Sequence, residues 1–378
     1  MRFLTASALA LFVATVAAAA QTATPPVGFE GSPAADTGYF QIVRRVVPHV
    51  WLLAEPKFQL QPIGNVTVIE QADGLVLVDA GGSPGAGRRI VEMVRSLSPK
   101  PVKAVIITQW HGDKPQGLSE ILKAWPGART ISTAATQAHL SDPATMNTPA
   151  APDAAKNAEM QKMIAGYAAD MREGITKAKT PEGRAGYDRE VRMLEQYALD
   201  MDGALTIAPK ESFTGRLTIP DKTAPVTAMF LGRANTDGDA VVWLPRQKIL
   251  IAGEIVILPF PYGFESYPAD WIATLEKLRA IKFKLLIPGH GMVQTDRAQI
   301  GRIEAALKDV RSQVAPLVAQ GLTLDQVKAK VDLSAEIKLF CGDDPWLGAW
   351  FRAFFVDPIV TSAYKEAKGQ PIVQSLKG

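Results

Sequence analysis

Short apolar runs bounded by turn residues dominate the first part of the chain. The segments FQIVRRVV, HVWLLAE, NVTVIEQ and LVLVDAG, all between residues 40 and 81, are rich in β-branched residues and have the length of strands. Asp73-Gly74 separates the last two and favours a tight hairpin. Apolar positions then recur at helical spacing over 84–97, and VKAVIIT, ending at Thr108, predicts a buried strand.

The pattern changes to helix in the middle of the chain. Two apolar stripes at helical spacing lie within Ala151 to Asp202 and flank a break at Pro181, which predicts an inserted helical hairpin. Strands resume with SFTGRLTIP, PVTAMFLG, AVVWLP, KILIAGE and KLLIPGHG, and the chain from residue 296 to 378 is helical again. Two blocks of strands followed by helices predict an α/β protein with two sheets faced by helices.

The N-terminus has the pattern of an export signal. Arg2 precedes an apolar run from Phe3 to Ala20, and small residues lie just before Gln21. An uncleaved anchor is the alternative, but the alanine-rich run favours a signal peptide over 1–20, with export to a bacterial periplasm. We expect a linker over 21–38, a main domain over 39–295 and a helical extension over 296–378. No other segment reaches the roughly 20 apolar residues of a membrane span.

Charge and cysteine content exclude several classes of protein. The chain has 378 residues, with 41 basic and 38 acidic side chains, and a net charge of +3 is too small to indicate nucleic-acid binding. We therefore expect a small-molecule or protein partner. Cys341 is the single cysteine, so neither an intramolecular disulfide nor a cysteine-rich zinc site is possible, and we expect it to be a packed thiol.

Four turns collect polar residues directly after apolar strands. They are TQWHGDKPQG after residue 107, GRANTDGD over 232–239, Gly253-Glu254, and PGHG over 288–291. Side chains at strand ends converge when their strands share sheets, so these turns predict one site. The first turn offers a histidine and an aspartate two residues apart, as a metal site would, but then a lysine.

These segments resemble the metallo-β-lactamase superfamily, a four-layer αββα sandwich. The order VDAGG, TQWHGDKPQG, GRANTDGD, IAGEI, IPGHG follows that family's motifs and covers roughly residues 47–291. The resemblance implies a site for two zinc ions, which polarise a substrate and generate hydroxide from water. The first zinc would be held by Gln109, His111 and Asn235, where the family has three histidines. His111 is the one imidazole among them.

At the second zinc, the resemblance implies Asp113, Lys114 and His290 where the family has aspartate and two histidines. Glu254 replaces the bridging aspartate, and Asp79 matches an aspartate that orients the family's site from behind. A protonated lysine has no lone pair to give a metal. Two unit charges about 4 Å apart repel by roughly 4 kcal/mol at an effective dielectric near 20, and a dication doubles this.

We therefore expect the Lys114 ammonium to occupy part of the space of the second zinc and to neutralise Asp113 and Glu254. Buried carboxylates without metals need such a partner, because otherwise they would take up protons. We expect either no cofactor or a single weakly bound metal ion, with zinc as the first candidate. Its ligands would be His111, Asp113, Glu254 and His290.

For function, two classes remain open at this stage. The first is a hydrolase acting on a small ester, lactone or amide with one metal or none, in which His111 or His290 is the base, Lys114 stabilises negative charge and Asp113 completes the catalytic set. The second is a catalytically silent binding or accessory protein, a pseudoenzyme that keeps the pocket.

A proline-punctuated aromatic segment directly follows Glu254. It runs from Leu258 to Trp271 and could form a wall for an apolar or aromatic ligand, although ordinary packing is the alternative for each ring. Its rings are Phe260, Tyr262, Phe264 and Tyr267. His49 and His139 lie outside the motifs, and we expect them to be surface or structural residues.

Overall fold

The computed structural model describes residues 30–31, 42–54, 63–142, 145–146 and 148–374. The predicted signal peptide lies outside these residues, and so does the predicted linker apart from β1 (Glu30–Gly31). Within the described residues, no helix is both long and apolar enough to cross a bilayer.

The first sheet has eight strands in sequence order. They are β1, β2 (Ile42–Val47), β3 (Val50–Ala54), β4 (Val66–Glu70), β5 (Leu75–Val78), β6 (Val102–Ile106), β7 (Arg129–Thr133) and β8 (Glu211–Phe213). Pairing is antiparallel up to β5 and parallel from β5 to β8. Every side chain of β5 is buried, as expected where helices and a second sheet cover both faces.

The second sheet has five strands in the order β13-β12-β11-β10-β9. They are β9 (Arg216–Ile219), β10 (Val226–Phe230), β11 (Ala240–Leu244), β12 (Ile249–Gly253) and β13 (Leu285–Pro288). The segment SFTGRLTIP, expected as one strand, is two: β8 closes the first sheet and β9 begins the second. The break falls at Thr214-Gly215, where glycine removes the side chain that would continue the pleat.

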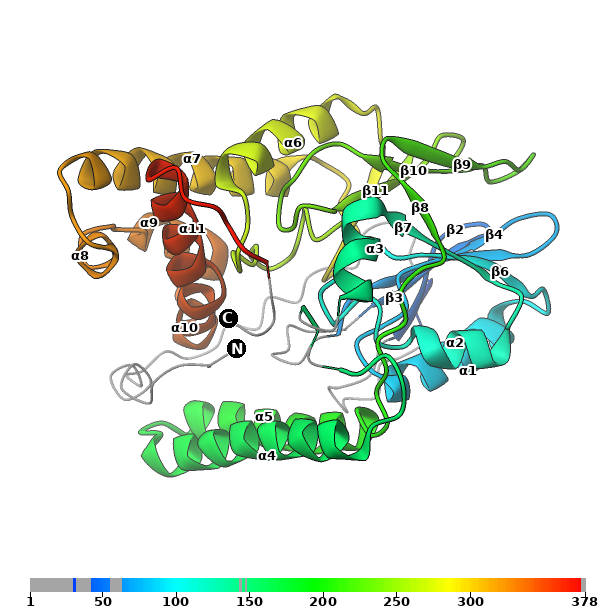
Figure 1. Cartoon of the computed structure of the whole chain (residues 1–378), viewed down its shortest axis with the longest axis horizontal. Helices are drawn as coiled ribbons and strands as arrows, with labels where there is room; N and C mark the ends of the chain where they lie inside the picture. Colours follow the sequence, from blue (N-terminus) through cyan, green and yellow to red (C-terminus); the bar gives the residue numbers. More distant parts are fainter. Residues whose placement is uncertain (1–29, 32–41, 55–62, 143–144, 147, 375–378) are drawn as a thin grey trace.

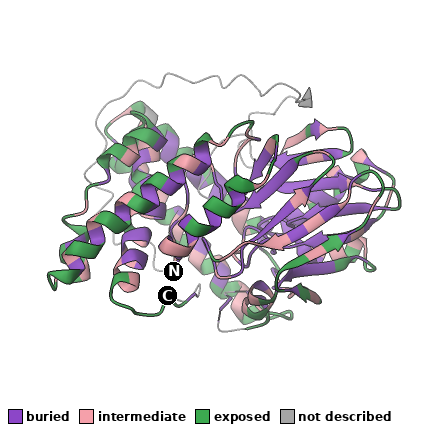
Figure 2. Cartoon of the chain, turned by 90° about the horizontal axis from the view of Figure 1, so that it is seen from above, coloured by how far each residue is buried: buried purple, intermediate pink, exposed green. Residues whose placement is uncertain are grey.

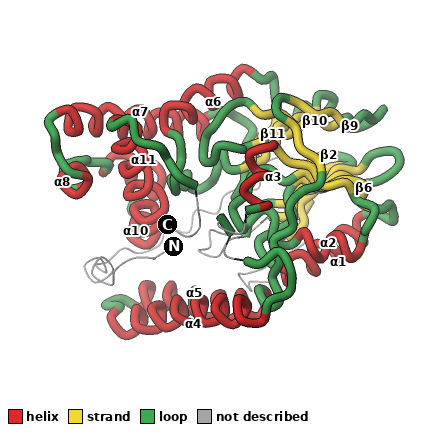
Figure 3. The backbone as a smooth tube through the Cα atoms, in the orientation of Figure 1, coloured by secondary structure: helices red, strands yellow, loops and turns green. Residues whose placement is uncertain are grey.

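The two sheets pack face to face between two layers of helices, which confirms the predicted αββα sandwich (Figures 1 and 3). Figure 2 shows the strands as the most buried part of the molecule. Helices α1 (Pro84–Leu97) and α2 (Leu118–Ala124) cover the first sheet. Helices α6 (Pro268–Ala280) and α7 (Ala298–Ala319) cover the second.

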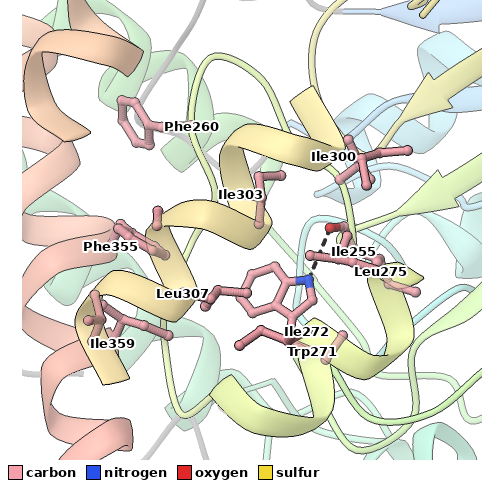
Figure 4. Packing of buried hydrophobic residues seen from close by; sticks show 14 of the residues in the cluster. Ile255, Phe260, Trp271, Ile272, Leu275, Ile300, Ile303, Leu307, Phe355 and Ile359 are labelled. Atoms are coloured by element: carbon pink, nitrogen blue, oxygen red, sulfur yellow. Dashed lines mark hydrogen bonds between the residues drawn. The ribbon is translucent and has the colours of Figure 1, made fainter. Parts of the chain in front are cut away.

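Trp271 of α6 lies at the centre of the second helical layer (Figure 4). It is fully buried, and its indole Nε1 donates to the carbonyl of Ile255 at 3.1 Å, so its one polar atom is satisfied. Because Ile255 directly follows Glu254, this contact fixes the chain leaving the predicted site. Leu307 of α7 and Phe355 belong to the same cluster.

A pair of helices stands in the predicted insert. Helices α4 (Ala154–Lys177) and α5 (Pro181–Asp200) pack on each other and break at Pro181 as expected. The Thr180 side chain caps α5 by accepting from the backbone N–H of Gly183. The pattern did not predict α3 (Ala134–Ser141), which is short and capped by Thr133.

From α7 to Ala367 the chain is mostly helical. It contains α8 (Leu324–Lys328), α9 (Ser334–Cys341), α10 (Pro345–Phe351), a π-helical segment η2 (Arg352–Val356) and α11 (Asp357–Ala367). Cys341 is buried, as expected, and burial raises the pKa of its thiol to about 12. The helices agree with the predicted extension, while the domain boundaries themselves stay a prediction.

Candidate active site

The four polar turns meet at one edge of the sandwich. The turn after β6 is held by Asp79, whose carboxylate accepts from the backbone N–H and the hydroxyl of Thr108 at 2.8 to 3.0 Å. Asp79 has a φ of 67°, a left-handed conformation that is uncommon for residues other than glycine. Burial raises the pKa of Asp79 to about 7, against the opposing charge of Lys114. The carboxyl thus supports the turn from behind.

Lys114 lies at the centre of the site and is fully buried. Its Nζ is 2.7 Å from Oδ2 of Asp113 and 2.5 Å from Oε1 of Glu254, and it donates to the carbonyl of Gly289 at 3.1 Å. The backbone carbonyl of Lys114 accepts from the N–H of Ala80 at 2.8 Å. The ammonium therefore contacts residues from both sheets.

His290 completes a cluster of four charged groups. Its Nε2 is 3.1 Å from Oδ2 of Asp113 and 3.3 Å from Oε1 of Glu254. Burial alone would lower the pKa of His290, but Glu254 and Asp113 outweigh it and hold this pKa well above the ordinary value. The ring of Tyr262 packs edge-on against His290 at 5.3 Å.

The same balance fixes the other charges. Burial opposes ionisation of Lys114, but Asp113 and Glu254 reverse the effect and raise its pKa. Burial would raise the pKa of each carboxyl, and Lys114 and His290 lower both instead. The cluster therefore holds two cations and two anions with no net charge, and Lys114 is an ammonium, not a base.

The residues at the first zinc position make local hydrogen bonds. The Gln109 side-chain oxygen accepts from the backbone N–H of His111 at 2.5 Å, and Asn235 Nδ2 donates to the carbonyl of Tyr262 at 2.7 Å. The other amide atoms, Nε2 of Gln109 and Oδ1 of Asn235, are buried without a hydrogen-bond partner among the described residues. Neither side chain offers an imidazole nitrogen.

His111 lies beside the cluster rather than in it. Among the residues that the structure describes, its ring has no hydrogen-bond or ion-pair partner and packs edge-on against Trp110 at 4.5 Å. Burial lowers the pKa of His111, and the attraction of Asp113 and Glu254 only partly offsets this. The imidazole is therefore neutral near pH 7, and it is partly exposed.

A three-residue group could hold a metal ion. Ligand atoms of Asp113, Glu254 and His290 lie within 4.8 Å of one another, and the structure leaves the expected fourth ligand, His111, outside this group. The Lys114 ammonium contacts both carboxylates. A zinc pair does not fit these residues, because His111 is the one imidazole at the first position and a cation already neutralises the carboxylates of the second.

The aromatic segment divides between two environments. Phe260 is fully buried in the core with Phe351, so for this ring packing is the correct alternative. Tyr262 touches His290 and joins the site to Phe354 of the C-terminal helices. Tyr262 is therefore the ring of this segment that lies next to the charged cluster.

The two remaining histidines are structural or exposed, as expected. His49 is exposed and its Nδ1 lies 2.8 Å from the Glu70 carboxylate. His139 is partly buried, contacts the Asp237 carboxylate at 2.9 Å and packs against the Trp110 ring. It supports the turn over 232–239.

Three residues that no motif indicated also shape the site. Asn65 Nδ2 donates to the carbonyls of Pro288 and Gly291 at 2.9 and 2.8 Å, which fixes the turn that carries His290. A Cβ at Gly64 would lie 2.5 Å from Lys114 Nζ. Tyr197 of α5 packs against Ile63, so the helical pair reaches this edge. The sequence around Asn65 contains no recognisable motif, so the role of this residue could not be predicted from the sequence.

Comparison with known proteins agrees with this geometry. The profile of the metallo-beta-lactamase superfamily matches residues 61–290. The chain is 26% identical over 299 residues to a linear primary-alkylsulfatase of Pseudomonas sp. (strain ATCC 19151), covering 75% of this chain and 52% of that protein. It is 23% identical over 235 residues to a metallo-beta-lactamase type 2 of Bacillus sp. (strain 170), covering 61% of this chain and 67% of that protein.

A solved structure extends the similarity to the whole fold. The stereoselective inverting sec-alkylsulfatase Pisa1 from Pseudomonas sp. superposes with a TM-score of 0.57 at 17% identity, covering 86% of this chain and 50% of that one. The chain thus spans about half the length of both alkylsulfatases. At this identity the superposition supports the fold alone.

Proposed function

The chain belongs to the metallo-β-lactamase superfamily, and from this premise we propose that it is a hydrolase-like enzyme for small ester-type molecules that works without that family's zinc pair. His111 is the proposed general base. The observation that carries the proposal is the position of its partly exposed imidazole, which has no hydrogen-bond partner among the described residues, beside a buried cluster of two cations and two anions.

The proposed chemistry uses each group in the state that the geometry favours. His111 takes a proton from water as the water oxygen bonds to the central atom of the ester, and the ester bond breaks as His111 returns that proton to the leaving oxygen, which releases an alcohol and an acid. Within this neutral cluster, the hydrogen-bond donors Lys114 and His290 are the groups that we assign to stabilise negative charge on the reacting oxygen, in a site of low dielectric. Asp113 holds both cations in place.

The ester class follows from the relatives and the site together. The similar alkylsulfatase acts, by its name, on sulfate esters of linear primary alcohols. The ring of Tyr262 beside His290 supplies apolar surface at the site. Alkyl sulfates and simple carboxylic esters are therefore the substrates to test first.

A second function is favoured by one observation. Both carboxylates and the carbonyl of Gly289 contact the Lys114 ammonium, which is fully buried. If the cluster serves only to fix the turns, the chain is a catalytically silent ligand-binding protein.

Hydrolysis assays with matched variants separate the two functions. We expect the protein, freed of metal with a chelator, to hydrolyse a p-nitrophenyl ester or an alkyl sulfate, and His111→Ala to reduce kcat by roughly a hundredfold, as for loss of a general base. His49→Ala is the control, since His49 is exposed and lies outside the four polar turns. Equal rates for His111→Ala and the parent, or no turnover at all, would favour the binding protein.

We also propose that the chain is exported. The apolar run over 3–20 and the small residues before Gln21 support this. Expression in a Gram-negative bacterium, followed by N-terminal sequencing of the periplasmic fraction, should find a chain that begins near Gln21. Recovery of a chain with an intact N-terminus from the cytoplasm would contradict export.

A further inference from the structure

The residues after α11 form a strap that returns to the middle of the molecule (Figure 1). Residues 367–371 are exposed, and Val373 is 63% exposed. The side chain of Gln374 is the exception, with 7% of its surface exposed. A single polar side chain therefore anchors the end of the described strap.

The carboxamide of Gln374 is bound at all of its polar positions. Its Oε1 accepts from the indole Nε1 of Trp110 at 3.0 Å and from the backbone N–H of Asp237 at 3.2 Å. Its Nε2 donates to the carbonyls of Glu265 at 3.2 Å and Asn235 at 3.4 Å. Two donors and two acceptors in this arrangement match a primary carboxamide.

These groups belong to the turns of the candidate active site. Trp110 lies between Gln109 and His111, and its ring is 4.5 Å from that of His111. Asn235 stands at a position where the family resemblance implies a zinc ligand. The strap thus ends next to the proposed base.

The residues of the subsite are also positioned by features that do not involve Gln374. With the strap in place Trp110 is fully buried, and Gln374 supplies the partner that a buried indole N–H needs. Glu265 has a φ of 48°, a left-handed conformation, at the residue whose carbonyl accepts from the amide. His139 contacts the Asp237 carboxylate at 2.9 Å and so steadies the turn that supplies the second donor.

We propose that Trp110, Asp237, Asn235 and Glu265 form a binding subsite for a primary carboxamide, and that Gln374 fills it in cis so that the strap covers the site. A carboxylate would satisfy the two donors but would place a charged oxygen against two carbonyl oxygens. An amide nitrogen avoids that repulsion. The ligand class is therefore the neutral carboxamide.

The indole N–H of Trp110 in the full chain reports on this subsite by NMR, with its resonance assigned from Trp110→Phe. We expect Gln374→Ala to shift the resonance and to speed its exchange with solvent roughly fivefold to tenfold, as for loss of one hydrogen bond. Val373→Ala, in the exposed neighbour, should leave both unchanged. Propionamide added to the Gln374→Ala protein should return the resonance toward its position in the parent, and should leave the parent protein unaffected.

Butanone tests the amide specificity, because it has the carbonyl but no N–H groups. We expect it to act far more weakly than propionamide on the Gln374→Ala protein. An unchanged Trp110 resonance in Gln374→Ala would overturn the docking of the strap. Equal effects of butanone and propionamide, or equal effects of propionamide on parent and variant, would overturn the carboxamide subsite. None of these readouts needs turnover, so they stand or fall independently of the proposed hydrolysis.

Discussion

Replacing Lys114 with methionine removes the one ammonium that contacts both Asp113 and Glu254 and keeps the length of the side chain. His290 remains, so the variant cluster holds two carboxylates against one cation, and one buried carboxylate is left unmatched. Breaking a buried ion pair by removing one partner costs about 3–5 kcal/mol. The variant should therefore lose a large part of its stability near pH 7.

A pH series tests the physical reason for this loss. In the parent, Lys114 holds the pKa values of Asp113 and Glu254 below their ordinary range. The two carboxylates therefore stabilise the folded state above their unfolded pKa values near 4, and this stabilisation is lost as pH falls through their lowered pKa values in the folded state. In the variant, burial raises the pKa of the unmatched carboxyl. Stability then falls as pH rises above about 4, by roughly 1.4 kcal/mol per pH unit for one proton.

Urea unfolding followed by circular dichroism, in buffers with a chelator, gives the difference directly. Between about pH 4.3 and pH 7 the folded variant keeps one proton that the unfolded chain has released. This difference lowers the free energy of unfolding by roughly 4 kcal/mol, which agrees with the cost of breaking the pair. Lys123→Met is the matched control: Lys123 is 69% exposed and pairs with Glu120 on the surface, so its loss should cost under about 1 kcal/mol. A Lys114→Met loss that is below about 1 kcal/mol, or that is equal at pH 4.5 and pH 7, would refute the reasoning.

The remaining predictions concern metal content, packing and a second buried carboxyl. Protein purified without chelator should hold far less than one zinc per chain by elemental analysis. Lys114→His should not restore tight zinc binding, because Gln109 still replaces an imidazole. Stoichiometric zinc in either protein would contradict the inference that Lys114 takes the place of the second zinc. Gly64→Ala should destabilise the folded protein by about 1–3 kcal/mol, because its Cβ would lie 2.5 Å from Lys114 Nζ. Gly127→Ala is the control: open space surrounds this position, so the change in stability on thermal unfolding should be under about 0.5 kcal/mol. Burial raises the pKa of Asp239 to about 8, so the free energy of unfolding should decrease as pH rises from the unfolded pKa near 4 to about 8. Asp239→Asn should flatten this part of the plot of unfolding free energy against pH. An unchanged slope in the variant would contradict the role of Asp239.

Sequence patterns located the strands and the site turns because both depend on short-range rules. The buried strand over 102–106 and the turn that carries His111 to Lys114 are adjacent in sequence, and the topology of two sheets brings the other turns to them. The split of SFTGRLTIP was missed because an uninterrupted pattern of strand residues does not reveal that the chain changes sheets at Gly215. Helix α3 was missed because its eight residues are too few to show a period.

The electrostatic state of the site depends on distances that no sequence pattern contains. Whether Lys114 is a base or an ammonium follows from its contacts with two carboxylates, one of them Glu254 on the opposite sheet. The separation of Phe260 from Tyr262 likewise depends on how one loop turns between the core and the site. Gln374 is 264 residues from Trp110 along the chain, so nothing local connects them.

The helical pair α4 and α5 bears on the order in which the chain folds. Strands β7 and β8 are hydrogen-bonded neighbours, yet residues 134–210 separate them. Contacts between residues far apart in sequence form slowly, because the loop between them must close, at a cost in chain entropy, before the contacts can stabilise the structure. The pair packs on itself, and its flanks meet where the backbone N–H of Thr206 donates to the carbonyl of Pro149 at 2.8 Å. We expect early formation of this hairpin to shorten the effective loop, so that the insert influences when the edge strand β8 joins the sheet.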